Sequence, residues 1–142
     1  MPKEFQRFVI SQVAILIRDG KCLILEDAAH PGRYILPGGR IDEGEESEPA
    51  FRRELKEEIN LDDFKNLGLV SYDIWYVKNE MKALCVLVFL IENNDSPIQL
   101  SPEHLSAKWI SVNQIATTNF VWPKAGKMIA DGFTYYKLIK KY

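Results

Sequence analysis

Apolar runs separated by turn signals indicate several strands along this chain. The segment Val9–Ile17 is almost continuously apolar, and the Asp19-Gly20 dipeptide that follows is typical of a tight hairpin turn. Apolar runs bounded by turn residues are typical of strands that are buried in a sheet. The strands that we expect lie at residues 9–17, 22–25, 67–77, 83–91 and 108–112.

Two other segments have the pattern of helices. The first is expected to begin with Ser47 as its N-cap and to end near Ile59, followed by Asn60, which tolerates the left-handed conformation. The second follows Pro123, where apolar residues recur at steps of three and four. Its apolar positions are Ala125, Met128, Ile129, Phe133, Tyr136 and Ile139. Strands on both sides of a central helix predict an α/β or α+β fold, with a mixed sheet covered by helices.

Composition narrows the class of protein. The 142 residues are 46% hydrophobic and 27% charged, so we expect one folded domain over residues 1–142. A formal net charge of −2 argues against stable binding of nucleic acid. The longest apolar run, residues 83–91, is about half of a membrane span, and the chain starts without a signal-peptide pattern. We therefore expect a cytoplasmic protein without a membrane partner, and Cys22 and Cys85 as buried thiols.

The acidic residues are concentrated in one stretch of the chain. Residues 42–63 hold ten acidic and three basic residues, a net charge of −7, whereas the rest of the chain carries +5. An acidic block of this kind is either a solvated surface or a binding site for a cation. The spacing of the acidic residues separates these two interpretations.

Helical spacing gathers three carboxylates on one side of the first helix. At 100° per residue, Glu54, Glu57 and Glu58 fall within an arc of about 100°. This arc lies beside an apolar stripe that consists of Phe51, Leu55 and Ile59. Like-charge pairs at this spacing cost only about 0.2–0.5 kcal/mol each, so repulsion alone does not exclude a solvated surface. The preceding Gly38-Gly39 favours a cation, because glycine lets a backbone carbonyl approach the oxygen ligands that Mg²⁺ prefers.

The segment from Gly39 to Leu61 resembles a known motif. Its sequence, GRIDEGEESEPAFRRELKEEINL, is similar to the Nudix box, G-x5-E-x7-R-E-U-x-E-E-x-G-U, where U is a bulky aliphatic residue. Eight of the nine fixed positions match, and the one departure is Asn60 in place of glycine. Asn60 follows the helix, where asparagine can take the left-handed geometry that glycine adopts. The resemblance to Nudix hydrolases implies an α/β/α sandwich, a mixed β-sheet flanked by helices.

The resemblance also implies roles for the matching residues. Those that match the family's ligands of a divalent metal ion, Mg²⁺ or Mn²⁺ as a substitute, are Gly38, Glu54, Glu57 and Glu58. Arg53 and Glu45 match a pair that holds the loop against the helix and orients the carboxylates. We expect catalysis to rest on Glu54, Glu57 and Arg53 within the box. Family members hydrolyse a nucleoside diphosphate linked to another group, X, by attack of water on phosphorus.

Several residues outside the box are further candidates. Glu103 lies where several branches of the family carry a functional glutamate, as base or extra metal ligand, or else it is a plain loop acid. His104 beside it is a phosphate contact or proton shuttle, or else a surface histidine. Arg33 and Arg40 flank the glycine turn and are candidate phosphate contacts. His30 is expected to be structural or solvated.

Aromatic residues offer a place for a nucleobase. Trp75 and Tyr76 are neighbours on a predicted strand, so their rings point to opposite faces. One of the two is a candidate for stacking on a base, and the alternative is packing in the core. Asn119, Phe120 and Trp122 precede the last helix and are candidates for the lining of a base pocket.

The leading interpretation is a Mg²⁺-dependent Nudix pyrophosphohydrolase that acts on a small nucleotide or nucleotide-sugar substrate, as a monomer or homodimer. The alternative is a Nudix domain that binds or senses a nucleotide without turnover. Loss of box carboxylates would indicate that alternative, and all of them are present. The group X stays open between dinucleoside polyphosphates, ADP-ribose-type sugars and damaged nucleoside triphosphates, because loops outside the box decide it.

Overall fold

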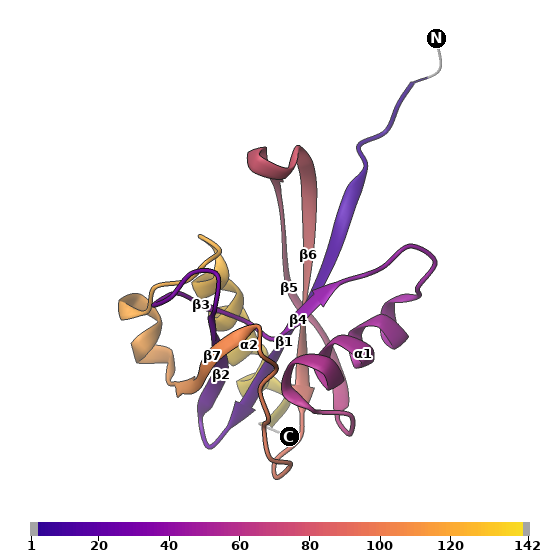
Figure 1. Cartoon of the computed structure of the whole chain (residues 1–142). Coiled ribbons are helices and arrows are strands. Elements are labelled where there is room, and N and C mark those ends of the chain that lie inside the picture. Colours follow the sequence, from indigo (N-terminus) through magenta and orange to yellow (C-terminus); the bar gives the residue numbers. More distant parts are fainter. Residues whose placement is uncertain (1–2, 141–142) are drawn as a thin grey trace.

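The computed structural model describes residues 3–140 (Figure 1). Its strands are β1 (Phe8–Arg18), β2 (Lys21–Asp27), β3 (Tyr34–Ile35), β4 (Gly38–Arg40), β5 (Lys65–Val77), β6 (Lys82–Glu92) and β7 (His104–Ile110). Its helices are α1 (Ser47–Ile59) and α2 (Ala125–Lys140), with short 3-10 turns at η1 (Lys78–Glu80) and η2 (Val112–Thr117). Neither α-helix within residues 3–140 is long and apolar enough to cross a membrane.

Strand β1 organises the sheet. It runs parallel to β6 over residues 8–16 and antiparallel to β4 over residues 11–13. Its end turns at Asp19-Gly20 into β2, which also pairs with β3 and β7, while β5 pairs with the far side of β6. The sheet is therefore mixed, as predicted, and the short strand β4 lies against β1 beside α1 (Figure 1).

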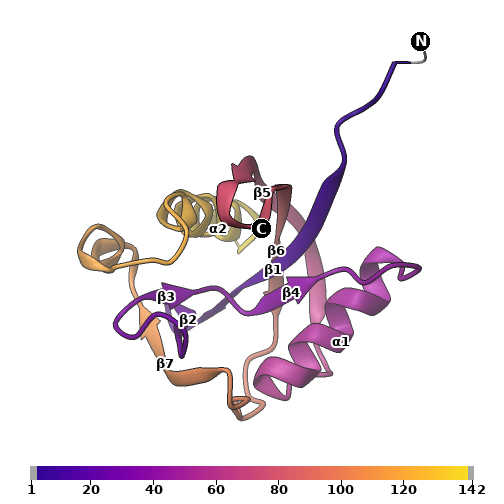
Figure 2. The same cartoon turned by 45° about the horizontal axis from the view of Figure 1, so that its top comes forward.

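Alternating side chains of β1 build one core on each face of the sheet. Val13, Ile15 and Ile17 pack on the side of α2, whereas Ala14 and Leu16 pack on the side of α1. Figure 2 shows the two helices on opposite faces, which is the predicted α/β/α sandwich. The α1 residues in the core are the predicted stripe of Phe51, Leu55 and Ile59. Burial of each such side chain contributes roughly 1.5–3 kcal/mol, so α1 is held firmly on the sheet.

Helix α1 ends as predicted but begins differently. Asn60 adopts the left-handed conformation, with φ 56° and ψ 35°, and its N–H bonds the carbonyls of the last turn. The N-cap is Glu46 rather than Ser47, and its side chain makes no capping hydrogen bond. The Ser47 hydroxyl instead donates to Oε1 of the buried Gln12, whose Nε2 donates to the Ser47 carbonyl at 2.9 Å. A contact with β1 thus replaces the predicted cap.

Two further expectations are corrected. The last strand covers residues 104–110 rather than 108–112, because it pairs with β2 from its start and Val112 already belongs to η2. Cys22 is buried, but Cys85 is only partly buried. Cys85 pairs with Ile74 of β5, which is 49% exposed, so this face of the sheet is incompletely covered.

Candidate active site

The glycines of β4 let α1 approach the sheet. Gly38 has a φ of 146°, and a Cβ atom there would lie 2.0 Å from the backbone oxygen of Gln12. A Cβ atom at Gly39 would lie 2.3 Å from the carboxyl group of Glu54. Real Cβ atoms essentially never come within 3.0 Å of such neighbours. At Gly38 the neighbour is backbone and φ is positive, so this position suits glycine alone, whereas a side chain at Gly39 would displace the carboxyl end of Glu54. The pair therefore places bare backbone against the carboxylates of α1.

Three glutamates of α1 converge beside β4, as the helical spacing predicts. Glu58 is buried, and its Oε1 accepts a hydrogen bond of 2.9 Å from the N–H of Gly38. The side chain of Glu54 is 17% exposed and that of Glu57 is 58% exposed. Burial raises the pKa of Glu54, the nearby Arg53 opposes that rise, and the charges of Glu57 and Glu58 add to it. The cluster is anionic and partly desolvated, a state that a bound cation relieves.

Arg53 ties the loop before α1 to this cluster. Its Nε and Nη2 donate to the two carboxylate oxygens of Glu45 at 2.8 and 2.7 Å. Its Nη1 donates to Glu54 at 3.0 Å and to Glu57 at 3.2 Å. The bidentate bond to Arg53 lowers the pKa of Glu45 to about 2, and the same bond raises the pKa of Arg53. Arg53 therefore orients Glu54 and Glu57, whereas Glu58 is oriented by the N–H of Gly38 in β4.

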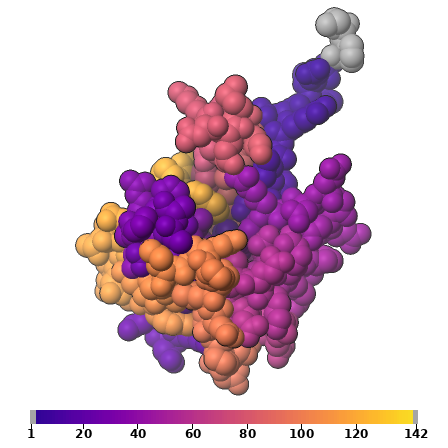
Figure 3. All heavy atoms as spheres, in the orientation of Figure 1, coloured from indigo at the N-terminus to yellow at the C-terminus, as the bar shows by residue number. Residues whose placement is uncertain are grey.

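The segment before β7 closes the other side of the cluster. The Ser101 N–H donates to the backbone oxygen of Glu58 at 2.9 Å. His104 Nε2 lies 3.3 Å from Oε2 of Glu58, and this contact raises the pKa of His104. In Figure 3 this segment, in orange, lies against the magenta surface of α1. The predicted candidates Glu103 and His104 thus both lie at the carboxylate cluster.

These groups surround an open cavity of about 340 Å³, which we call the carboxylate cavity. Its lining residues are Gly38, Gly39, Arg40, Glu54, Glu57, Glu58, Ser101 and Glu103. The lining includes all four predicted metal ligands and the catalytic candidates Glu54, Glu57 and Glu103. The remaining candidate, Arg53, bonds Glu54 and Glu57 and connects them to Glu45 in the preceding loop. The structure therefore brings the carboxylates of the box and Glu103, from a distant segment of the chain, together around one cavity.

A second cavity, of about 360 Å³, opens on the other side of Arg40. Its aromatic lining consists of Trp75 from β5 and Trp122 from the segment before α2, and we call it the indole cavity. The two rings meet edge to face with centroids 5.6 Å apart. His30 also lines this cavity, and its Nδ1 lies 2.7 Å from Oδ2 of Asp27. Arg40 lines both cavities, so the two lie next to each other.

Other aromatic and basic candidates lie elsewhere. Tyr76 is 53% exposed and belongs to neither lining, because it points to the opposite face of β5 from Trp75. Phe120 packs against the α2 core, and Asn119 contributes its backbone oxygen to the N–H of Tyr34 at 2.9 Å. Arg33 is exposed and lines neither cavity. Of the five aromatic and amide candidates, only the two tryptophans form a pocket.

Two residues at the site were missed by the sequence analysis. Gln12 holds the start of α1, and Ser101 lines the carboxylate cavity with a buried hydroxyl that has no hydrogen-bond partner among residues 3–140. The signal for Gln12 is its polar side chain within the apolar run of β1. Ser101 has no signal, because its distance from the box in sequence hides its contact with Glu58.

The donor set of the carboxylate cavity fits a divalent cation. Carboxylates of α1 and Glu103 supply hard oxygen atoms, and the unbonded hydroxyl of Ser101 is a further oxygen. Within residues 3–140, a group with ligand atoms all within 4.8 Å of one another is formed by Glu58, Glu103 and His104. Arg53 contacts only Glu54 and Glu57 of the three α1 carboxylates, and Glu54 is partly desolvated, so negative charge is left for a cation to balance.

Comparisons with known proteins agree with this geometry. The model of the NUDIX domain matches residues 9–132. An Ap4A hydrolase of C. elegans, 21% identical, superposes with a TM-score of 0.77 over 94% of this chain and 99% of that chain. A MutT protein from Methanosarcina mazei Go1, 21% identical, gives a TM-score of 0.75 over 99% and 100% of the two chains. The E. coli ORF135 protein, 19% identical, gives 0.75 over 94% of each.

These structural likenesses, at such low identity, concern the fold. A search of curated proteins finds no match. The domain match is of a different kind, because it spans most of the chain and includes every residue of the box that lies around the carboxylate cavity. The chain therefore belongs to the Nudix family.

Proposed function

We propose that this protein is a Mg²⁺-dependent pyrophosphohydrolase that cleaves a phosphoanhydride bond of a nucleoside diphosphate linked to a second group, X. The observation that carries the proposal is the convergence of Glu54, Glu57 and Glu58 on a cavity floored by Gly38 and Gly39. A cavity lined by carboxylates repels a polyphosphate unless a cation lies between them. The substrate class and the metal are therefore proposed together.

In this proposal the metal ligands are the three α1 carboxylates and Gly38, with Mn²⁺ as a substitute for Mg²⁺. When bound, the ion supplies positive charge for the phosphate oxygens at the point of cleavage. Arg53 orients Glu54 and Glu57 through its hydrogen bonds of 3.0 and 3.2 Å. A carboxylate of the cavity takes the proton of the attacking water, and the candidates are Glu54, Glu57 and Glu103.

The indole cavity is the proposed site for a nucleobase or for X. It lies next to the carboxylate cavity and shares Arg40 with it, so a ligand whose phosphates reach the carboxylates places its end group there. Stacking on indole suits any planar base, which explains why the cavity alone does not name the base. Solved structures of the same fold include an ADP-ribose pyrophosphatase and an Ap4A hydrolase, which suggests substrates for a first panel.

The test is hydrolysis of that panel with Mg²⁺, with Mn²⁺ and with a chelator. The panel consists of diadenosine tetraphosphate, ADP-ribose and normal and oxidised nucleoside triphosphates. Reaction in ¹⁸O-labelled water, followed by mass spectrometry of the products, identifies the phosphorus that water attacks. We expect metal-dependent cleavage of one class into two phosphorylated products or into a nucleotide and pyrophosphate.

The opposite result would favour the alternative of a nucleotide-binding Nudix domain. Binding of a panel member without turnover at any metal concentration would contradict the proposed hydrolysis. The presence of every carboxylate of the box favours turnover.

A further inference from the structure

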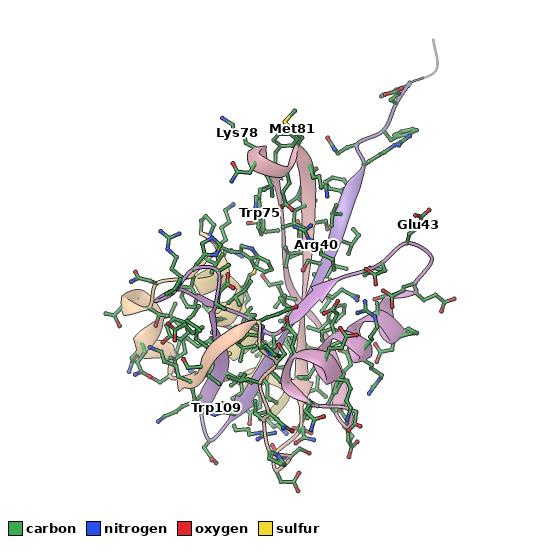
Figure 4. The ribbon with its side chains drawn as sticks, in the orientation of Figure 1. Arg40, Glu43, Trp75, Lys78, Met81 and Trp109 are labelled. Carbon is green, nitrogen blue, oxygen red and sulfur yellow. The ribbon has the colours of Figure 1, made fainter. Side chains whose placement is uncertain are left out.

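Arg40 is held by an acid from the far end of the β5–β6 hairpin. Its Nη2 donates to both carboxylate oxygens of Glu80 at 2.9 Å, and Glu80 lies in η1 at the hairpin tip. In Figure 3 this tip forms a separate lobe, and Figure 4 shows Arg40 and Trp75 below it. The hydrogen bond to Arg40 lowers the pKa of Glu80.

This ion pair contributes little to folding. The side chains of Arg40 and Glu80 are 45% and 37% exposed, and exposed pairs of this kind have small net effects because water solvates both charges. The pair joins strand β4 to a hairpin tip that has no buried residue. An ion pair that is so weakly held can be exchanged for a stronger anion at small cost.

The position of Arg40 makes a phosphate the anion for that exchange. Arg40 lies where the carboxylate cavity and the indole cavity meet, next to Gly39. A phosphate chain that runs from one cavity to the other passes this guanidinium, which suits bidentate binding of phosphate oxygens. In the free protein, Arg40 Nη2 donates to Glu80, so this donor must leave Glu80 before it can bind a phosphate.

We propose that Arg40 binds the phosphate chain of the substrate and that Glu80 is a built-in competitor which the phosphate displaces. This inference rests on the proposed function, because it assigns a specificity-determining role at the same site. Breaking the Arg40–Glu80 pair costs part of the binding free energy of every ligand. A ligand with a weakly charged phosphate group recovers less of this cost from Arg40 and therefore binds less well than a diphosphate. Glu80 and Asn79 already line the indole cavity, so a displaced Glu80 carboxylate and the Asn79 amide oxygen are in place to accept hydrogen bonds from an uncharged end group.

The experiment measures binding of inorganic pyrophosphate in the presence of Mg²⁺ by calorimetry. We compare the wild type with Glu80→Gln, Arg40→Gln, Arg40→Lys and the double variant Arg40→Gln/Glu80→Gln. Glu80→Gln should bind about two- to five-fold more tightly, the factor that corresponds to an exposed ion pair. Arg40→Gln should bind more weakly than Arg40→Lys, and Glu80→Gln should have no effect in the Arg40→Gln background.

Glu43→Gln is the matched control, because Glu43 is an exposed acid that points away from both cavities at the tip of another loop (Figure 4). An equal gain from Glu43→Gln would show a general charge effect and would overturn the proposal. So would weaker or unchanged binding by Glu80→Gln, or no pyrophosphate binding by the wild type and Glu80→Gln. Binding requires no turnover, so failure of hydrolysis in the panel would refute the proposed function while leaving this result standing.

Discussion

The two cavities that meet at Arg40 are built in different ways. The carboxylate cavity takes most of its lining from residues 38–58, a short stretch in which β4 and α1 follow each other. The indole cavity takes its lining from β1, the β2–β3 loop, β4, the β5–β6 hairpin and the segment before α2. One cavity is therefore almost local in sequence, whereas the other depends on the packing of five segments.

This difference matches the separate tasks that we propose for the two cavities, catalysis in the carboxylate cavity and substrate recognition in the indole cavity. The carboxylates of α1 are placed by helical spacing and by two glycines, of which Gly38 admits no side chain and Gly39 would take one only by displacing Glu54, so few substitutions leave their geometry intact. Part of the wall of the indole cavity lies on loops and on a hairpin tip, which tolerate sequence change. We expect variants of the first cavity to change turnover and variants of the second to change substrate affinity.

The largest effect is expected from Glu57→Gln in the carboxylate cavity. Loss of one carboxylate charge should lower kcat by roughly 10²–10⁴-fold, because it weakens cation binding and the stabilisation of the transition state. Thermal stability should hold or rise slightly, since like charges are relieved. Steady-state rates and thermal melts measure both quantities. Activity near that of the wild type at saturating Mg²⁺ would refute the assignment of Glu57 as a ligand.

A smaller effect of a different kind is expected from Trp75→Ala in the indole cavity. Loss of a stacking surface should raise KM by about tenfold with little change in kcat, given the usual contribution of base stacking. Tyr76→Ala is the control, because Tyr76 is the neighbouring aromatic residue on the opposite, exposed face. Circular dichroism confirms that both variants fold. A fall in kcat at unchanged KM would place Trp75 outside the binding site.

Binding of Mg²⁺ should distinguish the cavities through stability. At ten times its Kd, an ion that binds only the folded protein stabilises it by about 1.4 kcal/mol, which raises Tm by roughly 3–5 °C. Glu54→Gln/Glu58→Gln should lose most of this increment, and Trp75→Ala should keep it. Monovalent salt at matched ionic strength should give much less, because screening is not coordination. Equal shifts in the wild type and the double variant would place the ion elsewhere.

The smallest effect concerns the acid side of the pH range. Arg53 lowers the pKa of Glu45 to about 2 in the folded protein, below the ordinary value of 4.5. The stability from this pair is therefore fully present above about pH 4.5 and is lost as the pH falls towards 2. Glu45→Gln should melt below the wild type at pH 6, and the two Tm values should converge near pH 2. A difference that is independent of pH would show that the ion pair does not cause it.

The sequence by itself determined the helix that bears the carboxylates. A period of 3.6 residues fixes which side chains share a face, so the Phe51 stripe and the three-glutamate arc are found where the spacing predicts them. Asn60 is left-handed as its residue type at the helix end predicts. The predicted N-cap was wrong, because the Ser47 side chain bonds Gln12 of β1 instead of the backbone of its own helix. Local pattern does not decide between a cap and a contact with another strand.

Only the tertiary structure decided what surrounds that helix. The contact of Ser101 with Glu58, the meeting of Trp75 with Trp122, and the bond of Arg40 to Glu80 each join segments far apart in the chain. These contacts depend on the parallel pairing of β1 with β6 and on the antiparallel partners of β2. Residue periodicity describes one element at a time, whereas a cavity is the space left when several elements pack together.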